Sequence, residues 1–213
     1  MTSLLCQPGS GPASSLPVFG SARDLDRAPL ELRVHDRHDP HRARIESYIQ
    51  QRYEEQFGAV LRDWLPQLVS VQIDGEIMAA AGYRHAAEPL FLERYLAHRI
   101  EDSLPARDGQ CPSRSRIVEA GQFAATRAGA GRLLIPMLAR HLRGQGYQWA
   151  VTTATRELRR MFTRMGISPM MLAPAPASAL DEPARRDWGS YYEHDPFVVA
   201  GYLGQVVDEL GIE

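Results

Sequence analysis

Two hydrophobic periodicities alternate in the second half of this chain, and this alternation restricts the possible folds more than any other feature. Residues 117–124 are mostly apolar, as in a buried strand, and residues 133–143 repeat apolar side chains at helical spacing. A strand at 148–153, a helix at 156–165 and a short strand at 170–173 follow. This order predicts an α/β domain with a right-handed crossover between parallel strands.

The first half predicts further elements for the same domain. A short strand begins near Leu30, and a helix over residues 42–57 carries apolar side chains on one face. Asp74-Gly75 predicts a hairpin between strands at 68–73 and 76–84. The remaining expectations are a strand or extended segment at 90–96, helical turns at 97–104, a loop at 105–115, a Pro/Ala-rich excursion at 174–187 and ordered sequence at 188–203.

The expected domain organisation is simple. Residues 1–28 are rich in Gly, Pro and Ser and have few large apolar side chains, so we expect a flexible leader. Residues 29–213 then form one domain, and with 44% hydrophobic residues they can build one sizeable core.

The charged residues exclude several chemistries. The chain has 24 arginines and no lysine, which excludes a Schiff base, a pyridoxal-phosphate anchor and a P-loop lysine. A net charge of −2 disfavours nucleic acid as a partner. Two cysteines supply neither a zinc set nor a disulfide framework, so we expect a reduced, cytoplasmic protein without a metal. No segment is long and apolar enough for an integral membrane span.

Three histidines are spaced as metal ligands could be. His35, His38 and His41 alternate with Asp36, Asp39 and Pro40, and the proline and turn-forming residues favour a solvated loop over a metal site.

The Gly-rich segment 126–132 joins a strand to a helix. The first helical turn has unpaired N–H groups and the positive end of the helix dipole, so it binds anions well. Gly129 and Gly131 would let the backbone approach a phosphate, and Arg127 and Arg132 would add bidentate charge. A tight strand–helix turn without a ligand is the alternative interpretation.

The element order and the Thr126-Arg-Ala-Gly-Ala-Gly131 turn resemble the GNAT acyltransferase superfamily, which binds the coenzyme A pyrophosphate at a Gln/Arg-x-x-Gly-x-Gly/Ala turn. Here Thr126 occupies the first motif position, and Arg127 follows one place late. Phe162 stands where the superfamily often has a tyrosine acid. The cofactor-binding residues that this resemblance implies are Phe123, Ala124, Thr126, Arg127, Ala128, Gly129, Ala130, Gly131, Arg132, Thr152 and Thr155.

A second resemblance covers residues 42–203. The segments Phe91-Leu-Glu-Arg-Tyr-Leu96, Ile117-Val-Glu-Ala-Gly-Gln-Phe-Ala124, Thr152-Thr-Ala-Thr-Arg-Glu-Leu-Arg159 and Trp188-Gly-Ser-Tyr-Tyr-Glu-His-Asp-Pro196 resemble the thermostable hemolysin family, a GNAT-like branch similar to the acyl-homoserine lactone synthases. The resemblance implies a GNAT-like fold with a mixed central sheet, whose central strands splay apart and are flanked by helices.

Acyl transfer to an amine needs a base and a proton donor. Glu119 is the preferred base because it lies in an apolar strand, where burial raises the pKa of a carboxyl, and Glu93 is the second candidate. For Glu119 the alternative is a structural side chain, either exposed at an edge or paired with an arginine. Tyr192 or His194 could replace the missing tyrosine acid. Trp188, Ser190 and Tyr191 could line the acceptor pocket, and a structural clamp on the sheet is the alternative for this aromatic cluster.

Three functions remain open from the sequence. The first is acyl transfer from a coenzyme A or acyl-carrier-protein phosphopantetheine thioester to a small, amine-type acceptor, with an acyl carrier protein as a possible partner. The second is the direct membrane activity that the family name suggests. The third is a ligand-binding module without catalysis on the same fold. The acyl length, the acceptor and the oligomeric state stay open.

Overall fold

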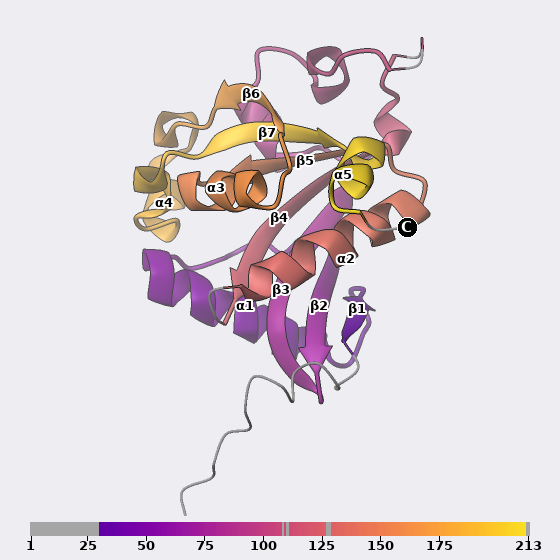
Figure 1. Cartoon of the computed structure of the whole chain (residues 1–213). Coiled ribbons are helices and arrows are strands. Elements are labelled where there is room, and N and C mark those ends of the chain that lie inside the picture. Colours follow the sequence, from indigo (N-terminus) through magenta and orange to yellow (C-terminus); the bar gives the residue numbers. More distant parts are fainter. Residues whose placement is uncertain (1–29, 108, 110, 127–128, 212–213) are drawn as a thin grey trace, which may run out of the picture.

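The protein is built around one seven-stranded mixed sheet (Figure 1). The computed structural model describes residues 30–107, 109, 111–126 and 129–211. The strand order is β1-β2-β3-β4-β5-β7-β6, in which β4 and β5 are parallel and all other neighbours are antiparallel. The strands are β1 (Glu31–His35), β2 (Gln67–Ile73), β3 (Glu76–His85), β4 (Ile117–Ala125), β5 (Trp149–Ala154), β6 (Met170–Pro174) and β7 (Phe197–Tyr202).

Helices cover both faces of this sheet. In Figure 1, α1 lies behind the sheet, and α2, α3 and α5 lie in front of it. The helices are α1 (Arg42–Phe57), α2 (Ala130–Gly144), α3 (Arg156–Arg164), α4 (Glu182–Asp187) and α5 (Leu203–Glu209). The short 3-10 helices are η1 (Phe91–Tyr95), η2 (Ile100–Ser103), η3 (Arg114–Arg116), η4 (Ala177–Ala179) and η5 (Tyr191–His194).

The expected α/β alternation is confirmed, and two local predictions are wrong. Residues 90–96 form η1 and not a strand, because the Glu93 carboxylate accepts the Leu90 N–H and closes a helical turn there. Helix α2 begins at Ala130, three residues before the predicted start. Gly129, with φ of 103°, turns the chain directly into the helix.

The central strands splay apart as expected. Strands β4 and β5 pair only from Ile117 to Glu119 and from Trp149 to Val151. Beyond that point β4 stays with β3 as far as Ala125, whereas β5 stays with β7. A register shift accompanies the divergence, with Gln122 at a positive φ of 55°.

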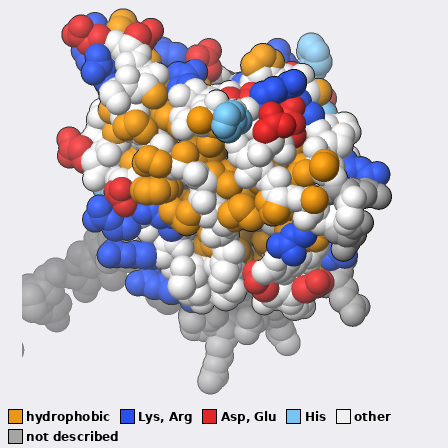
Figure 2. Space-filling model, turned by 90° about the horizontal axis from the view of Figure 1, so that it is seen from above, with side chains coloured by type: hydrophobic (Ala, Val, Ile, Leu, Met, Phe, Trp, Pro, Cys, Tyr) orange, Lys and Arg blue, Asp and Glu red, His pale blue; other side chains and the backbone are white. Residues whose placement is uncertain are grey.

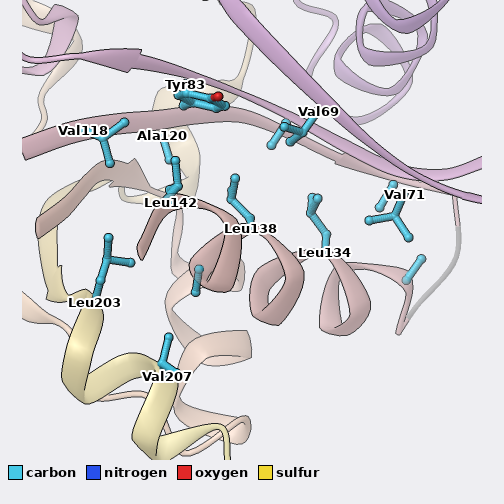
Figure 3. Packing of buried hydrophobic residues seen from close by; sticks show 14 residues of the cluster. Val69, Val71, Tyr83, Val118, Ala120, Leu134, Leu138, Leu142, Leu203 and Val207 are labelled. Carbon is cyan, nitrogen blue, oxygen red and sulfur yellow. The ribbon is translucent and has the colours of Figure 1, made fainter. Parts of the chain in front are cut away.

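The larger core lies between the sheet and α2 (Figure 3). Leu134, Leu138 and Leu142 repeat at i, i+4 and i+8, which places them on one side of α2, facing the sheet. Each is at most 4% exposed, so truncation of any of them to alanine would cost about 2–5 kcal/mol. This packing fixes the first turn of α2 relative to the end of β4.

One face of the molecule is markedly apolar. Seen from above, hydrophobic side chains gather in the middle of the surface and charged side chains surround them (Figure 2). Met171, on edge strand β6, is 48% exposed. In the part of the chain that the structure describes, no helix has the length and apolar character needed to span a membrane.

Candidate functional site

The divergence of β4 from β5 opens a cleft of about 630 Å³. Gly129 and Gly131, at the start of α2, lie at one end of this cleft, and Glu119 lies at the other. From Glu119 to Ala125 the strand spans about 20 Å, at roughly 3.3 Å per residue. The cleft therefore joins a helix N-terminus to a buried carboxylate over the length of an extended chain.

The outer end has the backbone geometry of an anion site. Gly129 is the N-cap of the 15-residue helix α2. The first N–H groups of a helix have no preceding helical turn whose carbonyl oxygens could accept their hydrogen bonds. Gly131 lies against α3, and a Cβ there would come within 2.9 Å of the Met161 sulfur. Ala130 is buried in the core, and Arg132 is exposed.

Two of the predicted turn residues, Arg127 and Ala128, lie outside the described residues. Thr126 has a different position from the one expected of a phosphate ligand. Its hydroxyl is 2.7 Å from the Tyr48 hydroxyl and contacts two carbonyl oxygens of β3, so it anchors the end of β4 to α1 and β3.

The walls contain most of the other predicted cofactor residues. Phe123, Ala124 and Thr155 line the cleft, and Thr155 also caps α3 by accepting the Leu158 N–H. Thr152 does not line this cleft. It faces a small apolar cavity under α2, and its neighbour Thr153 lines the cleft with a buried hydroxyl that has no hydrogen-bond partner among the described residues.

The inner end is organised around Glu119. Its side chain is almost fully buried, and its two carboxylate oxygens accept the backbone N–H groups of Phe91 (3.0 Å) and Leu92 (3.1 Å). Burial raises the pKa of this carboxyl, and the Arg84 guanidinium and the two N–H groups oppose the shift. The carboxyl is therefore held in place while its pKa moves towards the range of a useful base.

Arg84 is the ionic partner of Glu119. The two residues are opposite each other in the β3–β4 register, and the Arg84 Nε lies 3.3 Å from the carboxylate oxygen. This Nε is buried and donates no well-aligned hydrogen bond to any described residue. The pair neutralises the charge of Glu119 and leaves its lone pairs only partly used.

An aromatic cluster forms the wall beside Glu119. The hydroxyls of Tyr95 and Tyr192 are 2.5 Å apart, and burial raises the pKa of both, so both stay protonated at neutral pH. Trp188 packs against Tyr191 and Tyr192. Tyr191 donates to the Thr153 carbonyl oxygen at 3.1 Å and so ties the cluster to β5.

The family of the chain follows from its sequence match. Residues 35–207 match the model of the thermostable hemolysin family. This protein belongs to the thermostable hemolysin family. No curated protein is a significant match to it.

Solved structures similar to this thermostable hemolysin family member share its fold. The acyl-homoserine lactone synthase LasI has 16% identity and a TM-score of 0.57 over 83% of this chain and 91% of its own. FeeM, an N-acyl amino acid synthase from uncultured soil microbes, has 10% identity and a TM-score of 0.58 over 86% and 95%. BjaI, solved with SAM and isopentyl-CoA, has 12% identity and a TM-score of 0.56 over 86% and 90%. The GNAT-like fold is thereby confirmed.

Of the predicted catalytic and substrate-binding residues of this family member, Glu93, Ser190 and His194 lie outside the cleft lining. Glu93 pairs with Arg114 at 2.6 Å and accepts backbone N–H groups, so it holds η1 in place. Ser190 donates to the carbonyl oxygen of Phe57 at the end of α1. His194 lies 3.3 Å from Glu157 and packs on the Phe57 ring.

One of the three histidines in segment 35–41 of this family member has a structural role. His35 is buried and lies 2.9 Å from both Asp39 and Ser70, whereas His38 and His41 are exposed. No group of three or more His, Cys, Asp or Glu side chains with metal-site geometry occurs among the residues that the structure describes.

Arg84, Arg94, Tyr95 and Thr153 also line the cleft of this thermostable hemolysin family member and were not among the predicted site residues. Arg94 and Tyr95 lie in the segment 91–96 that carries the family resemblance, so this segment held the available signal. Arg84 becomes visible only when the β3–β4 register is known, because that register places it opposite Glu119.

Proposed function

We propose that this protein is an acyltransferase that moves an acyl group from a coenzyme A or acyl-carrier-protein thioester to a small amine. The single observation that supports this most is the continuous cleft between the α2 N-terminus and Glu119. A helix N-terminus suits a phosphate, and a buried carboxylate with a raised pKa suits the removal of a proton from an amine.

The geometry favours a donor with a long arm. The phosphate end and the base are separated by about 20 Å of strand, so the reactive carbonyl must lie far from the phosphate. A phosphopantetheine thioester has this shape, whereas a compact acyl phosphate does not. The Thr153 hydroxyl, which has no hydrogen-bond partner among the described residues, would hold the arm together with backbone groups where β4 and β5 no longer pair.

The proposed chemistry is direct transfer. Glu119 takes a proton from the acceptor ammonium, and the free amine attacks the thioester carbonyl carbon. A C–N bond forms and the C–S bond breaks, so the sulfur leaves as a thiolate. Tyr192, kept protonated by burial, donates a hydrogen bond to the departing sulfur, and the second amine proton passes to the thiolate through water. The products are an amide and a free thiol.

The test is acyl transfer with purified protein. Acyl-CoA and acyl-carrier-protein donors of several chain lengths are offered with a panel of amines, and mass spectrometry detects the amide while a thiol reagent measures the released thiol. We expect amide and thiol in equal amounts from the wild type. The proposal fails if no donor yields an amide, and lysis of erythrocytes without any donor would favour direct membrane activity instead.

A further inference from the structure

Two tyrosine hydroxyls contact each other at the inner end of the cleft. Tyr95 lies in η1 and Tyr192 in η5, both side chains line the cleft, and their hydroxyl oxygens are 2.5 Å apart. This distance is at the short limit for a hydrogen bond between two hydroxyl groups. One hydroxyl donates to the other, so one hydrogen of the pair is left to bond a third group.

No described residue accepts that remaining hydrogen. Within residues 30–107, 109, 111–126 and 129–211, neither hydroxyl has a hydrogen-bond partner other than its fellow tyrosine. The neighbouring Tyr191 differs, because its hydroxyl donates to the Thr153 carbonyl oxygen at 3.1 Å. The remaining hydrogen of the Tyr95–Tyr192 pair is therefore available to a molecule in the cleft.

Ring packing and the fold of η1 place the pair near the base. The Tyr95 ring is 6.2 Å from the Phe91 ring, and the Tyr192 ring is 6.2 Å from the Trp188 ring. The Phe91 N–H is one of the two that the Glu119 carboxylate accepts. A 3-10 helix rises about 2 Å per residue, so the backbone from Phe91 to Tyr95 spans only about 8 Å. The hydroxyl pair and the base thus belong to the same end of the cleft.

We propose that Tyr95 is a positioning residue for acyl transfer, whose hydroxyl donates to the Tyr192 oxygen and thereby directs the Tyr192 hydrogen towards the departing sulfur. This inference rests on the proposed acyl transfer and adds a second tyrosine to it. Two hydroxyls that donate in series polarise each other, so Tyr192 becomes a stronger donor as negative charge forms on the sulfur. Neither tyrosine has to lose its proton, and burial, which raises the pKa of both, favours their neutral forms.

The first experiment needs no acceptor and no acyl transfer. The pKa of the thiol of bound coenzyme A is measured from the ultraviolet absorbance of its thiolate, with desulfo-coenzyme A as the blank. A hydrogen bond to a charged group stabilises it, so the pKa of the bound thiol should lie about 1–2 below that of free coenzyme A. Tyr192→Phe should abolish this lowering, and Tyr95→Phe should reduce it.

A second replacement at position 95 should change the thiol pKa in the opposite direction. 3-Fluorotyrosine in place of Tyr95 keeps the ring and the hydroxyl and makes the hydroxyl a stronger donor. It should lower the pKa of the bound thiol further than the wild type does. A side chain that only packs between η1 and η5 would not give opposite changes in these two variants.

The second experiment measures the single-turnover rate of amide formation. Tyr192→Phe should slow it roughly 10- to 100-fold, and Tyr95→Phe should slow it about 3- to 10-fold. The double variant should be no slower than Tyr192→Phe alone, because Tyr95 acts through Tyr192. A seleno-coenzyme A ester has the same arm and a better leaving group, so both losses should become smaller with it.

The matched control is Tyr83→Phe. The Tyr83 hydroxyl is 3.0 Å from the His141 Nε2, and Tyr83 does not line the cleft, so this variant should leave the thiol pKa and the rate unchanged. The inference is overturned if Tyr95→Phe behaves as the wild type, if its loss multiplies with that of Tyr192→Phe, or if its loss is equal with the selenoester. A larger loss from Tyr95→Phe than from Tyr192→Phe also overturns it, because Tyr95 would then face the sulfur itself.

The two experiments separate this inference from the proposed function. A lowered thiol pKa that depends on both tyrosines, without amide formation from any donor, would sink only the acyltransferase. Amide formation by a wild type whose bound thiol has the pKa of free coenzyme A would sink only the role of the tyrosine pair.

Discussion

Two buried chains of polar groups occur on opposite sides of the β2–β3 hairpin, and only one of them meets a cleft. In the first, His35 lies 2.9 Å from Asp39 and 2.9 Å from the Ser70 hydroxyl, the order of groups in a serine hydrolase. In the second, Glu119 is bound by Arg84 and by the N–H groups of η1. Judged by hydrogen-bond geometry alone, the first chain would be the better candidate for an active site.

Access to a cleft favours the second chain instead. Ser70 has no exposed surface, its hydroxyl also accepts a hydrogen bond from Gln72, and it lines neither described cavity. Strands β1 and β2 pair along the full length of β1, so nothing opens between them. Glu119 lies where β4 and β5 part, and the same burial that raises its pKa leaves it facing a cleft. Divergence of the strands distinguishes a site from a structural network.

The largest expected effect is on the rate of amide formation, and it tests directly which of the two polar chains is catalytic. Glu119→Gln keeps the shape of the side chain and removes the base, so the rate of amide formation should fall by about 10²- to 10⁴-fold. Ser70→Ala should leave the rate per folded molecule unchanged. The measurement is kcat/KM with the donor and acceptor that the acyl-transfer screen identifies, and equal losses in the two variants would contradict the assignment.

The pH dependence of acyl transfer tests the role of Glu119 as the base. Because burial raises the Glu119 pKa, the carboxyl becomes a base only above its ordinary value of 4.5, and kcat/KM should rise as pH increases through the shifted pKa. Since the folded pKa is above the unfolded one, ionising Glu119 also removes stability as pH rises through it. A profile whose acid limb lies at or below 4.5 would argue against Glu119 as the base.

Glu93 should behave in the opposite way. Hydrogen bonds from Arg114 lower its pKa from 4.5 to about 2, so its ionised form stabilises the fold above pH 4.5 and this contribution disappears as pH falls through 2. Glu93→Gln should therefore cost about 1–3 kcal/mol of unfolding free energy at pH 7 and almost none at pH 2. Urea unfolding at both values measures this, and an equal cost at both would exclude the ion pair as the cause.

Ser70→Ala should lower the unfolding free energy by as much as Glu93→Gln or less. The variant leaves His35 and Gln72 without their shared partner, which costs about 1–3 kcal/mol. Arg33→Gln is the reference for a small effect, because its pair with Glu31 is exposed and contributes about 0–1 kcal/mol. Thermal unfolding of the two variants should rank them in this order, and the reverse order would show that the His35 chain does not support the fold.

The sequence predicted much of the architecture because its periodicities are local. The helix over 42–57, the hairpin at Asp74-Gly75 and the alternation after residue 117 each follow from neighbouring residues. Residues 90–96 were assigned wrongly because the local hydrogen bond between Glu93 and Leu90 is supported by contacts from Arg114 and Glu119, which are distant in sequence. Local propensity cannot report such contacts.

What the sequence determined by itself was the α/β fold class, the turn at Gly129 and the choice of Glu119 as the candidate base. The tertiary structure decided which groups meet there. A strand alternates its side chains between two faces, so a one-residue difference separates Thr153 in the cleft from Thr152 under α2. The same register brings Arg84 to Glu119, and η1 turns Arg94 towards the cleft. Pairing between distant strands is a property of the whole sheet, and no local pattern encodes it.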